Sequence, residues 1–185
     1  VCDVYLNGVL LMSHKGGYTP LEVDLTDVLR KDGSDILSLR VDSSERADTP
    51  PFGGQLDYLT YGGIYRDVHL VFVEPVSVQW LKVETQNVLS SRAETNLKVA
   101  LRQPKNHVEV VNVVAELYAP DNSLVSTVER AQQSNETLRF DFPAISQPQL
   151  WQPDSPALYK VRVKLGTMTG VDIFEQHFGY RSAEF

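Results

Sequence analysis

The feature that most restricts the fold of this chain is a recurring alternation of apolar and polar residues in short segments. Leu21 to Leu25 and Tyr159 to Leu165 show it clearly, and turn residues such as Asn7-Gly8 separate segments of this kind. Alternation with a period of two is typical of half-buried β-strands, whereas an amphipathic helix repeats about every 3.6 residues. The sequence contains no long helical period, so we predict an all-β fold.

Composition agrees with globular domains and excludes several functional classes. The 185 residues fit one large or two small domains, with 42% hydrophobic and 22% charged residues. The formal net charge is -7, and Lys and Arg are scattered without clusters, which argues against nucleic-acid binding. An acidic surface also disfavours anionic membranes, and no apolar run is long enough to span a bilayer. We therefore expect neither nucleic acid nor a membrane as a partner.

The first half is predicted to form a domain over residues 1–74. Asn7-Gly8 between two apolar runs is a strong signal for a β-hairpin. Further strands are expected at Leu21 to Leu25, Ile36 to Val41 and Val68 to Val73. Because Val1 to Leu6 already alternates like the interior of a strand, we interpret the chain as a fragment.

The second half is predicted to form a separate domain over residues 75–185. Its strands are expected at Val76 to Glu84, Thr95 to Leu101, Val108 to Tyr118, Leu124 to Val128, Thr137 to Phe142, Tyr159 to Leu165 and Val171 to Phe178. Short strands at regular spacing within roughly 100 residues are typical of an immunoglobulin-like β-sandwich.

A long loop before the middle of the chain is the first candidate for function. Asp42 to Gly54 has no strand pattern and leads to Asp57, and loops of this length in compact domains are often functional. A carboxylate accepts several charge-assisted hydrogen bonds, which suits sugar hydroxyls. Asp57 is thus a candidate sugar ligand, although an aspartate beside Gly54 and Gln55 is more often a turn former.

Gly62-Gly63 after this loop permits backbone conformations that residues with a Cβ resist. Arg66 and Asp67 are expected to form a buried charge pair rather than a catalytic one, because adjacent strand residues point to opposite faces. His14 is interpreted as structural, since spacing alone assigns it no partner carboxylate.

Aromatic residues cluster around the same loop and allow two interpretations. They would form either a surface that stacks on sugar rings or an ordinary core or interface. The residues are Phe52, Tyr58, Tyr61 and Tyr65.

The sequence does not indicate a complete active site. Glycoside hydrolysis normally uses two carboxylates across the scissile bond. Asn135-Glu136 imitates the asparagine-glutamate pair of many retaining glycosidases, but its surroundings have a strand pattern, so we treat the match as coincidence. No nucleophile elbow, phosphate loop or metal-ligand cluster occurs, and the single cysteine, Cys2, is interpreted as a structural thiol. We therefore predict no catalytic residue, metal site or cofactor.

Four motifs give this chain a resemblance to a known family. They are Val4 to Gly8, His14 to Leu21 with Asp24 to Thr26, Gly62 to Val68, and Leu150 to Tyr159 with Phe178 to Arg181. In this order and spacing they resemble glycoside hydrolase family 2, the β-galactosidase and β-glucuronidase family, over nearly the whole chain. His14 and Tyr18 match family positions and are interpreted as structural. Tyr180 replaces the usual Phe, and its added hydroxyl needs a partner or solvent.

The resemblance implies a fold and a site. Residues 1–74 would be a jelly-roll, galactose-binding-like β-sandwich that lacks its first strands, and residues 75–185 an immunoglobulin-like β-sandwich. In the family a catalytic (β/α)₈ barrel follows and carries both catalytic glutamates, so this chain alone is expected to be inactive. A family aspartate six residues before the glycine of "GIYR" reaches the sugar pocket, and Asp57 stands six residues before Gly63. Asp57 is therefore expected to bind substrate, with Gly62, Gly63 and Arg66 supporting its loop.

The function expected from this resemblance is that of a non-catalytic fragment of a retaining exo-β-glycosidase. A β-galactosidase is the first interpretation, because "GIYRDV" follows Tyr-Gly-Gly. The alternatives are a β-glucuronidase-type fragment, a stand-alone carbohydrate-binding protein and a purely structural pair of sandwiches. The expected partners are a terminal β-galactoside in the complete enzyme, the catalytic barrel of the same chain and further copies in a homo-oligomer. The sequence predicts no compartment.

Overall fold

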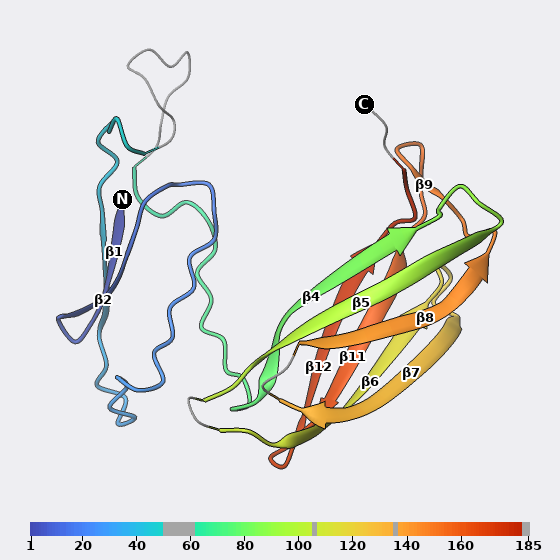
Figure 1. Cartoon of the computed structure of the whole chain (residues 1–185). Coiled ribbons are helices and arrows are strands. Elements are labelled where there is room, and N and C mark those ends of the chain that lie inside the picture. Colours follow the sequence, from blue (N-terminus) through green and yellow to red (C-terminus); the bar gives the residue numbers. More distant parts are fainter. Residues whose placement is uncertain (50–61, 105–106, 135–136, 183–185) are drawn as a thin grey trace. The chain divides into compact units, whose positions relative to one another are not determined.

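The computed structural model describes residues 1–49, 62–104, 107–134 and 137–182. Contacts divide the chain into two compact units, Val1–Leu70 and Val71–Phe185. Every regular element in these residues is a β-strand (Figure 1), so the predicted all-β class is confirmed. In the described part of the chain, no helix is long and apolar enough to cross a bilayer.

The first unit contains a three-stranded antiparallel sheet. Its central strand β1 (Cys2–Leu6) lies between β2 (Val9–His14) and β3 (Leu37–Val41). Asn7 and Gly8 have φ values of 52° and 81°, the left-handed conformation that a two-residue type I′ hairpin requires. The predicted Asn-Gly hairpin is therefore confirmed.

The side chain of Asn7 also fixes this hairpin to the residues before β3. Its Nδ2 donates to Asp35 Oδ1 at 2.6 Å, and its Oδ1 accepts a hydrogen bond from the Ile36 amide at 3.0 Å. One side chain thus satisfies two groups that are distant in sequence, which stabilises the β1–β3 pairing next to the turn.

Two strands predicted for residues 1–74 do not form. Leu21 to Leu25 and Val68 to Val73 carry the apolar pattern of strands, yet neither is a strand in the structure. The Leu25 carbonyl instead accepts the amides of Val28 and Leu29, which turns the chain. A strand needs paired backbone groups, and no described strand pairs with either segment. The described residues of this unit form one sheet, so the jelly roll stays a prediction.

The second unit is a sandwich of two antiparallel sheets (Figure 1). One sheet has the strand order β12-β11-β6-β7, and the other has the order β4-β5-β8. All seven strands predicted in this half are present. Their bounds are β4 Ser77–Gln86, β5 Arg92–Arg102, β6 Val110–Tyr118, β7 Leu124–Gln133, β8 Leu138–Ser146, β11 Tyr159–Gly166 and β12 Val171–Phe178; a short ribbon of β9 Trp151–Gln152 and β10 Ser155–Pro156 completes the unit.

The core of the sandwich lies between these sheets and follows the alternation in the sequence. On β11 the buried residues are Tyr159, Val161, Val163 and Leu165, and the residues between them face outward. Phe140 of β8 is fully buried in the same core cluster. Full burial of a side chain of this size stabilises a fold by about 1.5–3 kcal/mol, so the paired sheets provide a stable core.

Tyr180 finds the partner that its hydroxyl requires. Within the core, the Tyr180 hydroxyl and Thr95 Oγ1 share a buried hydrogen bond, and burial raises the pKa of Tyr180. The Tyr180 ring also lies edge-on to Tyr159 and Phe178, with centroid distances of 4.7 and 5.3 Å. The departure from the usual Phe is therefore accommodated by one threonine.

Candidate functional site

Asp57, the predicted sugar ligand, lies outside the described residues, as do its aromatic neighbours Phe52, Tyr58 and Tyr61. Asn135-Glu136 lies outside them too. The geometry that can be described is that of the residues on both sides of the segment 50–61, all of them in the first unit. These residues decide how the ends of that segment are held.

The two glycines of the predicted supporting loop are needed for different reasons. Gly63 has φ +94°, a conformation that strains residues with a Cβ. A Cβ on Gly62 would lie 2.8 Å from Ser43 Oγ, so this glycine allows the chain to pass close to the residues that follow β3. The sequence predicted a special backbone here, and the structure adds the close approach.

Tyr65 and Arg66 follow this turn and face one another. The Tyr65 hydroxyl donates to the Gly17 carbonyl oxygen at 3.3 Å, and the Arg66 guanidinium lies 5.6 Å from the centroid of the Tyr65 ring. Arg66 and Asp67 are both exposed, so the expected buried charge pair is wrong. Because the segment is irregular, the two residues are not the start of a buried strand.

The segment from His14 to Thr19 contacts residues on both sides of 50–61, and we call it the clasp. Lys15 Nζ donates to Asp48 Oδ2 at 2.5 Å, which holds the clasp to the residues just before residue 50. Tyr65 holds it to the residues after residue 61. Within the clasp, Thr19 Oγ1 and His14 Nε2 lie 3.2 Å apart, which agrees with a structural role for His14.

Charge at the clasp is balanced around Asp48. The hydrogen bond from Lys15, followed by that from Arg46, lowers the pKa of Asp48 to about 2. Arg46 Nε lies 3.3 Å from Asp48 Oδ1. Asp48 is therefore ionised at neutral pH, and its carboxylate accepts hydrogen bonds that hold the side chains of Lys15 and Arg46 in place. The sequence interpretation missed Lys15 and Asp48, since a pair this far apart leaves no local pattern.

The second unit has a depression where the two segments of the fourth sequence motif meet. The Trp151 amide donates to the Tyr180 carbonyl oxygen at 2.8 Å, which joins the Leu150 segment to the Phe178 segment. The depression has a volume of about 490 Å³ and is lined by Val83, Thr85, Trp151, Leu158, His177, Phe178, Gly179 and Arg181.

Trp151 is already packed within this depression. The Arg181 guanidinium lies 5.4 Å from the centroid of its ring. A Cβ on Gly179 would lie only 2.6 Å from Trp151 Cβ. Trp151 therefore fixes the two segments of this motif to one another, which is a structural role.

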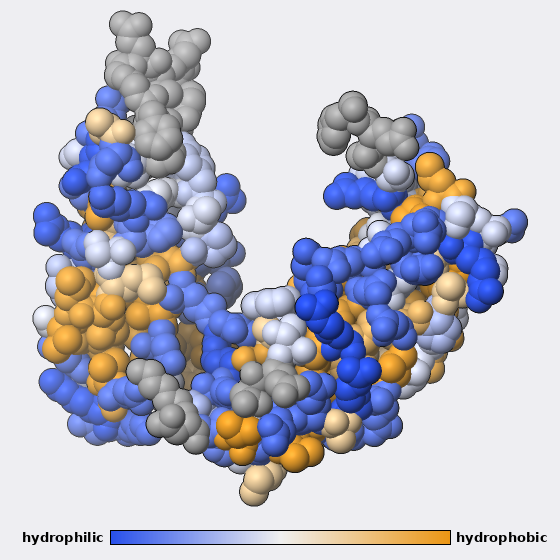
Figure 2. Space-filling view, in the orientation of Figure 1, coloured by the Kyte–Doolittle hydropathy of each residue, from blue (hydrophilic) through white to orange (hydrophobic). Residues whose placement is uncertain are grey.

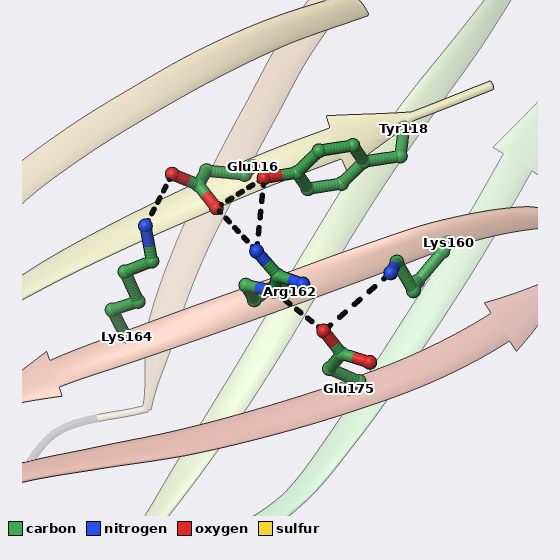
Figure 3. Close-up of polar contacts among 6 residues, drawn as sticks. All are labelled: Glu116, Tyr118, Lys160, Arg162, Lys164 and Glu175. Carbon is green, nitrogen blue, oxygen red and sulfur yellow. Dashed lines mark hydrogen bonds and ion pairs between the residues drawn. The ribbon is translucent and has the colours of Figure 1, made fainter. Parts of the chain in front are cut away.

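A network of charged side chains covers the outer face of the four-stranded sheet (Figure 3). Arg162 of β11 donates from Nε to Glu175 Oε1 at 2.5 Å. Its Nη1 lies 3.9 Å from Glu116 Oε2. Lys164 donates to Glu116 Oε1 at 2.7 Å. The hydrogen bond from Lys164 lowers the pKa of Glu116, and that from Arg162 lowers the pKa of Glu175.

Neither Glu116 nor Glu175 is suited to act as the proton donor in glycoside hydrolysis. The acid of a glycosidase needs a raised pKa to stay protonated near neutral pH, and the cations here act in the opposite direction. Nor do the described residues hold a group of three or more His, Cys, Asp or Glu side chains that could bind a metal ion. The network therefore has a structural role, which is to stabilise the outer face of the sheet.

Comparison with known proteins establishes the family. The family model of glycosyl hydrolases family 2 matches residues 76–181. β-Galactosidases of Thermoanaerobacterium thermosulfurigenes and Rhizobium meliloti are each 34% identical to this chain, over 99% and 92% of its length. The crystal structure of a Parabacteroides merdae β-glucuronidase with glycerol in its active site covers 100% of the chain with a TM-score of 0.90 and 27% identity. The chain belongs to glycosyl hydrolases family 2.

The chain spans about a quarter of the length of these proteins. It covers 26% and 22% of the two β-galactosidases and 25% of the β-glucuronidase. The resemblance inferred from the four motifs is confirmed at the level of the family. The role of Asp57 and the partners of the chain stay predictions.

Proposed function

We propose that these 185 residues are the non-catalytic N-terminal part of a retaining exo-β-glycosidase that hydrolyses terminal β-D-galactosides. The carrying observation is the 34% identity to two β-galactosidases over nearly the whole chain. In this proposal a (β/α)₈ barrel in the same polypeptide supplies both catalytic glutamates. The complete enzyme would be a homo-oligomer and would need no cofactor.

The first unit would contribute the rim of the sugar pocket through Asp57. An aspartate there would accept hydrogen bonds from sugar hydroxyls, and such charge-assisted bonds are stronger than neutral ones. The clasp supports this role, because the Lys15–Asp48 and Tyr65–Gly17 contacts hold the residues on both sides of 50–61. Gly62, Gly63 and Arg66 would set the path of the chain leaving that segment.

The test is Asp57→Ala in the intact enzyme, assayed on aryl β-D-galactosides and aryl β-D-glucuronides. Loss of a hydrogen bond to a charged group costs about 1.5–3 kcal/mol, so kcat/KM on the preferred substrate should fall about 10- to 150-fold. Asp27→Ala, at an exposed position of the same unit, is the matched control and should retain activity. Unchanged kcat/KM in Asp57→Ala would contradict the proposed contact.

A β-glucuronidase is the second candidate, because the TM-score of 0.90 is to an enzyme of that name. The two substrates in the same assay separate the candidates, since a glucuronide carries a carboxylate where a galactoside carries a hydroxymethyl group. A stand-alone carbohydrate-binding protein would hydrolyse neither substrate in its intact form but would bind sugar in a calorimetric titration.

A further inference from the structure

Three cationic side chains, which we call the cationic row, cross the outer face of the three-stranded sheet. Lys82 of β4 pairs directly with Lys98 of β5, and Lys98 pairs directly with Arg139 of β8. Directly paired residues lie on the same face of a sheet. Neighbouring strands lie about 4.8 Å apart, so the row extends over about 10 Å. Figure 2 shows hydrophilic side chains gathered over the region that β5 and β8 occupy in Figure 1.

The cationic row is an unfavourable arrangement for the fold itself. Like charges that lie directly opposite in a sheet lower its stability. Glu84 offsets part of the repulsion, because its carboxylate pairs with Lys82 and with Lys98, each at 2.8 Å. Arg139 is exposed and, within the described part of the chain, forms no ion pair. Local conflicts of this kind are expected at functional sites, and the positive charge left at Arg139 suits an anionic ligand.

The next row on this face, which we call the acceptor row, carries oxygen atoms that accept hydrogen bonds. Its members are Glu84, Asn96 and Asp141, which pair across the same three strands. Asn96 Nδ2 donates to Asp141 Oδ1 at 2.6 Å. The two carboxylates would repel a ligand that offers only negative charge, such as a nucleic-acid backbone. They would bind a ligand that also offers hydroxyl groups, because carboxylates accept charge-assisted hydrogen bonds.

An exposed tryptophan lies on the other side of the cationic row. Trp80 stands two residues before Lys82 on β4, so both side chains are on the same face, and it pairs with the small residue Ala100. Trp80 is 43% exposed. Among the residues that the structure describes, neither a ring nor a cation stacks on Trp80, whereas Arg181 stacks on Trp151. A tryptophan with a free surface is suited to packing against an apolar ligand face.

Cations, acceptors and an aromatic ring side by side match one class of ligand. An acidic glycan carries carboxylates on its uronic-acid rings, hydroxyl groups beside them, and apolar ring faces. The strand spacing of about 4.8 Å is close to the length of one sugar ring in an extended glycan, so successive carboxylates can reach successive cations. At physiological salt, exposed charges more than about 8 Å apart are largely screened. The cationic row therefore outweighs the negative net charge of the whole chain at this face.

We propose that the outer face of β4, β5 and β8 binds an acidic glycan. The cationic row binds uronic-acid carboxylates, Trp80 packs against a sugar ring, and the acceptor row accepts hydrogen bonds from sugar hydroxyl groups. The site lies within the second unit and would hold the enzyme on an acidic polysaccharide. It goes beyond the proposed hydrolysis and does not depend on Asp57.

Calorimetric titration of the intact protein with three polymers tests the proposal. Polygalacturonate carries carboxylates and hydroxyl groups, its methyl-esterified form lacks the charge, and poly-glutamate lacks the sugar. Polygalacturonate should bind, and its affinity should fall with added salt because exposed charges are screened. The other two polymers should each bind at least about tenfold more weakly, since each lacks several of the contacts. Equal binding of either one, or no binding of polygalacturonate, would overturn the proposal.

Two substitutions in the intact protein and a matched control locate the binding. Arg139→Gln should weaken polygalacturonate binding about 1.5- to 5-fold, and Trp80→Ala should weaken it about 2- to 10-fold. Arg30→Gln removes an exposed arginine of the first unit and should leave the affinity unchanged. If Arg139→Gln and Trp80→Ala bound as tightly as the control, the glycan would bind elsewhere and the proposal would be wrong.

A third substitution should strengthen binding, which an unfolded variant would not do. Glu84→Gln frees Lys82 and Lys98 from their shared carboxylate and keeps an oxygen that accepts hydrogen bonds. Its affinity for polygalacturonate should rise about 1.5- to 5-fold. An unchanged or lower affinity would contradict binding of carboxylates by the cationic row.

Discussion

The two units share an alternating sequence pattern but differ in how completely the apolar faces of their strands are buried. In the second unit, alternating strands face each other across a core, and residues such as Phe140 and Val161 are fully buried. In the first unit, the buried apolar side chains among the described residues are Val4 and Leu6, which are 4% and 3% exposed. The difference teaches that alternation creates a strand's two faces, while stability depends on whether a partner covers the apolar one.

This contrast separates stability from recognition in the molecule. The second unit has two sheets and a continuous core, so it is the more stable part of the chain. The first unit holds the clasp and the loop positions expected to carry a sugar contact, on a sheet with an open face. Four substitutions or sets of substitutions follow, from the largest expected effect to the smallest; the first compares the two units, and the other three probe contacts within the second unit.

The largest effect is expected from truncating a core residue. Phe140→Ala removes a fully buried aromatic side chain and should lower the free energy of unfolding by about 3–5 kcal/mol. Leu39→Ala on β3 of the first unit, where the side chain is 36% exposed, should cost less than about 1 kcal/mol in the 185-residue chain. Denaturant unfolding followed by circular dichroism compares the two. Equal losses would mean that the face of β3 is as well packed as the sandwich core.

A smaller loss of stability is expected when a Cβ is added at a glycine that has no room for one. Gly179→Ala would place a Cβ 2.6 Å from Trp151 Cβ, and overpacking of this kind costs about 1–3 kcal/mol. Gly170→Ala is the matched control, since its Cβ would meet Glu74 at an ordinary 3.6 Å. Both variants are compared in thermal unfolding. If Gly179→Ala were as stable as the control, the joint at Trp151 would be looser than the structure shows.

The buried hydroxyl pair allows a double-mutant cycle. Tyr180→Phe leaves Thr95 Oγ1 buried without its partner and should cost about 1–3 kcal/mol. Thr95→Val should cost a similar amount, because it leaves the tyrosine hydroxyl unpaired. The double variant should be more stable than the two single losses predict, since no buried hydroxyl remains unpaired. Additive losses in chemical denaturation would show that the two hydroxyls do not interact.

The smallest effect is expected from the two ion pairs that Glu84 forms with Lys82 and Lys98, and it depends on pH. Hydrogen bonds from Lys82 and then Lys98 lower the pKa of Glu84 from 4.5 to about 2. The folded pKa lies below the unfolded one, so the stabilisation is complete above pH 4.5 and is lost as the pH falls toward 2.

In the wild type the urea midpoint should therefore fall more steeply across this pH range than in Glu84→Gln, which cannot titrate there. Asp154→Asn, at an exposed position of the same unit, should follow the wild type. Parallel curves for wild type and Glu84→Gln would contradict the lowered pKa.

Local patterns predicted the parts of the fold that depend on neighbouring residues. Asn7-Gly8 indicated its hairpin because the turn conformation is a property of those two residues. The strand at Tyr159 to Leu165 was predicted because both of its faces are used, one by the core and one by solvent. For Val68 to Val73 the same logic gave a wrong result, since a strand also needs a partner that no local pattern reveals.

The candidate site was predictable only in part, for a related reason. The glycine pair at 62–63 signalled an unusual backbone, and the structure shows a positive φ at Gly63. The contacts that hold this region join residues far apart in the chain, such as Lys15 with Asp48 and Tyr65 with Gly17. Tertiary pairing of this kind depends on the fold, so a single sequence does not disclose it. The expected buried Arg66–Asp67 pair is wrong because the strand predicted at Val68 to Val73 does not form, which leaves both side chains exposed.

The central claim is that the second unit is a complete sandwich while the first is an open sheet, and two natural probes test it in one titration. The single cysteine, Cys2, lies in β1, and both tryptophans, Trp80 and Trp151, lie in the second unit. Thiol labelling and tryptophan fluorescence therefore report on different units across a denaturant series of the 185-residue chain. We predict that Cys2 reaches its unfolded labelling rate at clearly lower denaturant than the fluorescence transition. Coincident transitions would contradict the account, because they would show one cooperative unit of uniform stability.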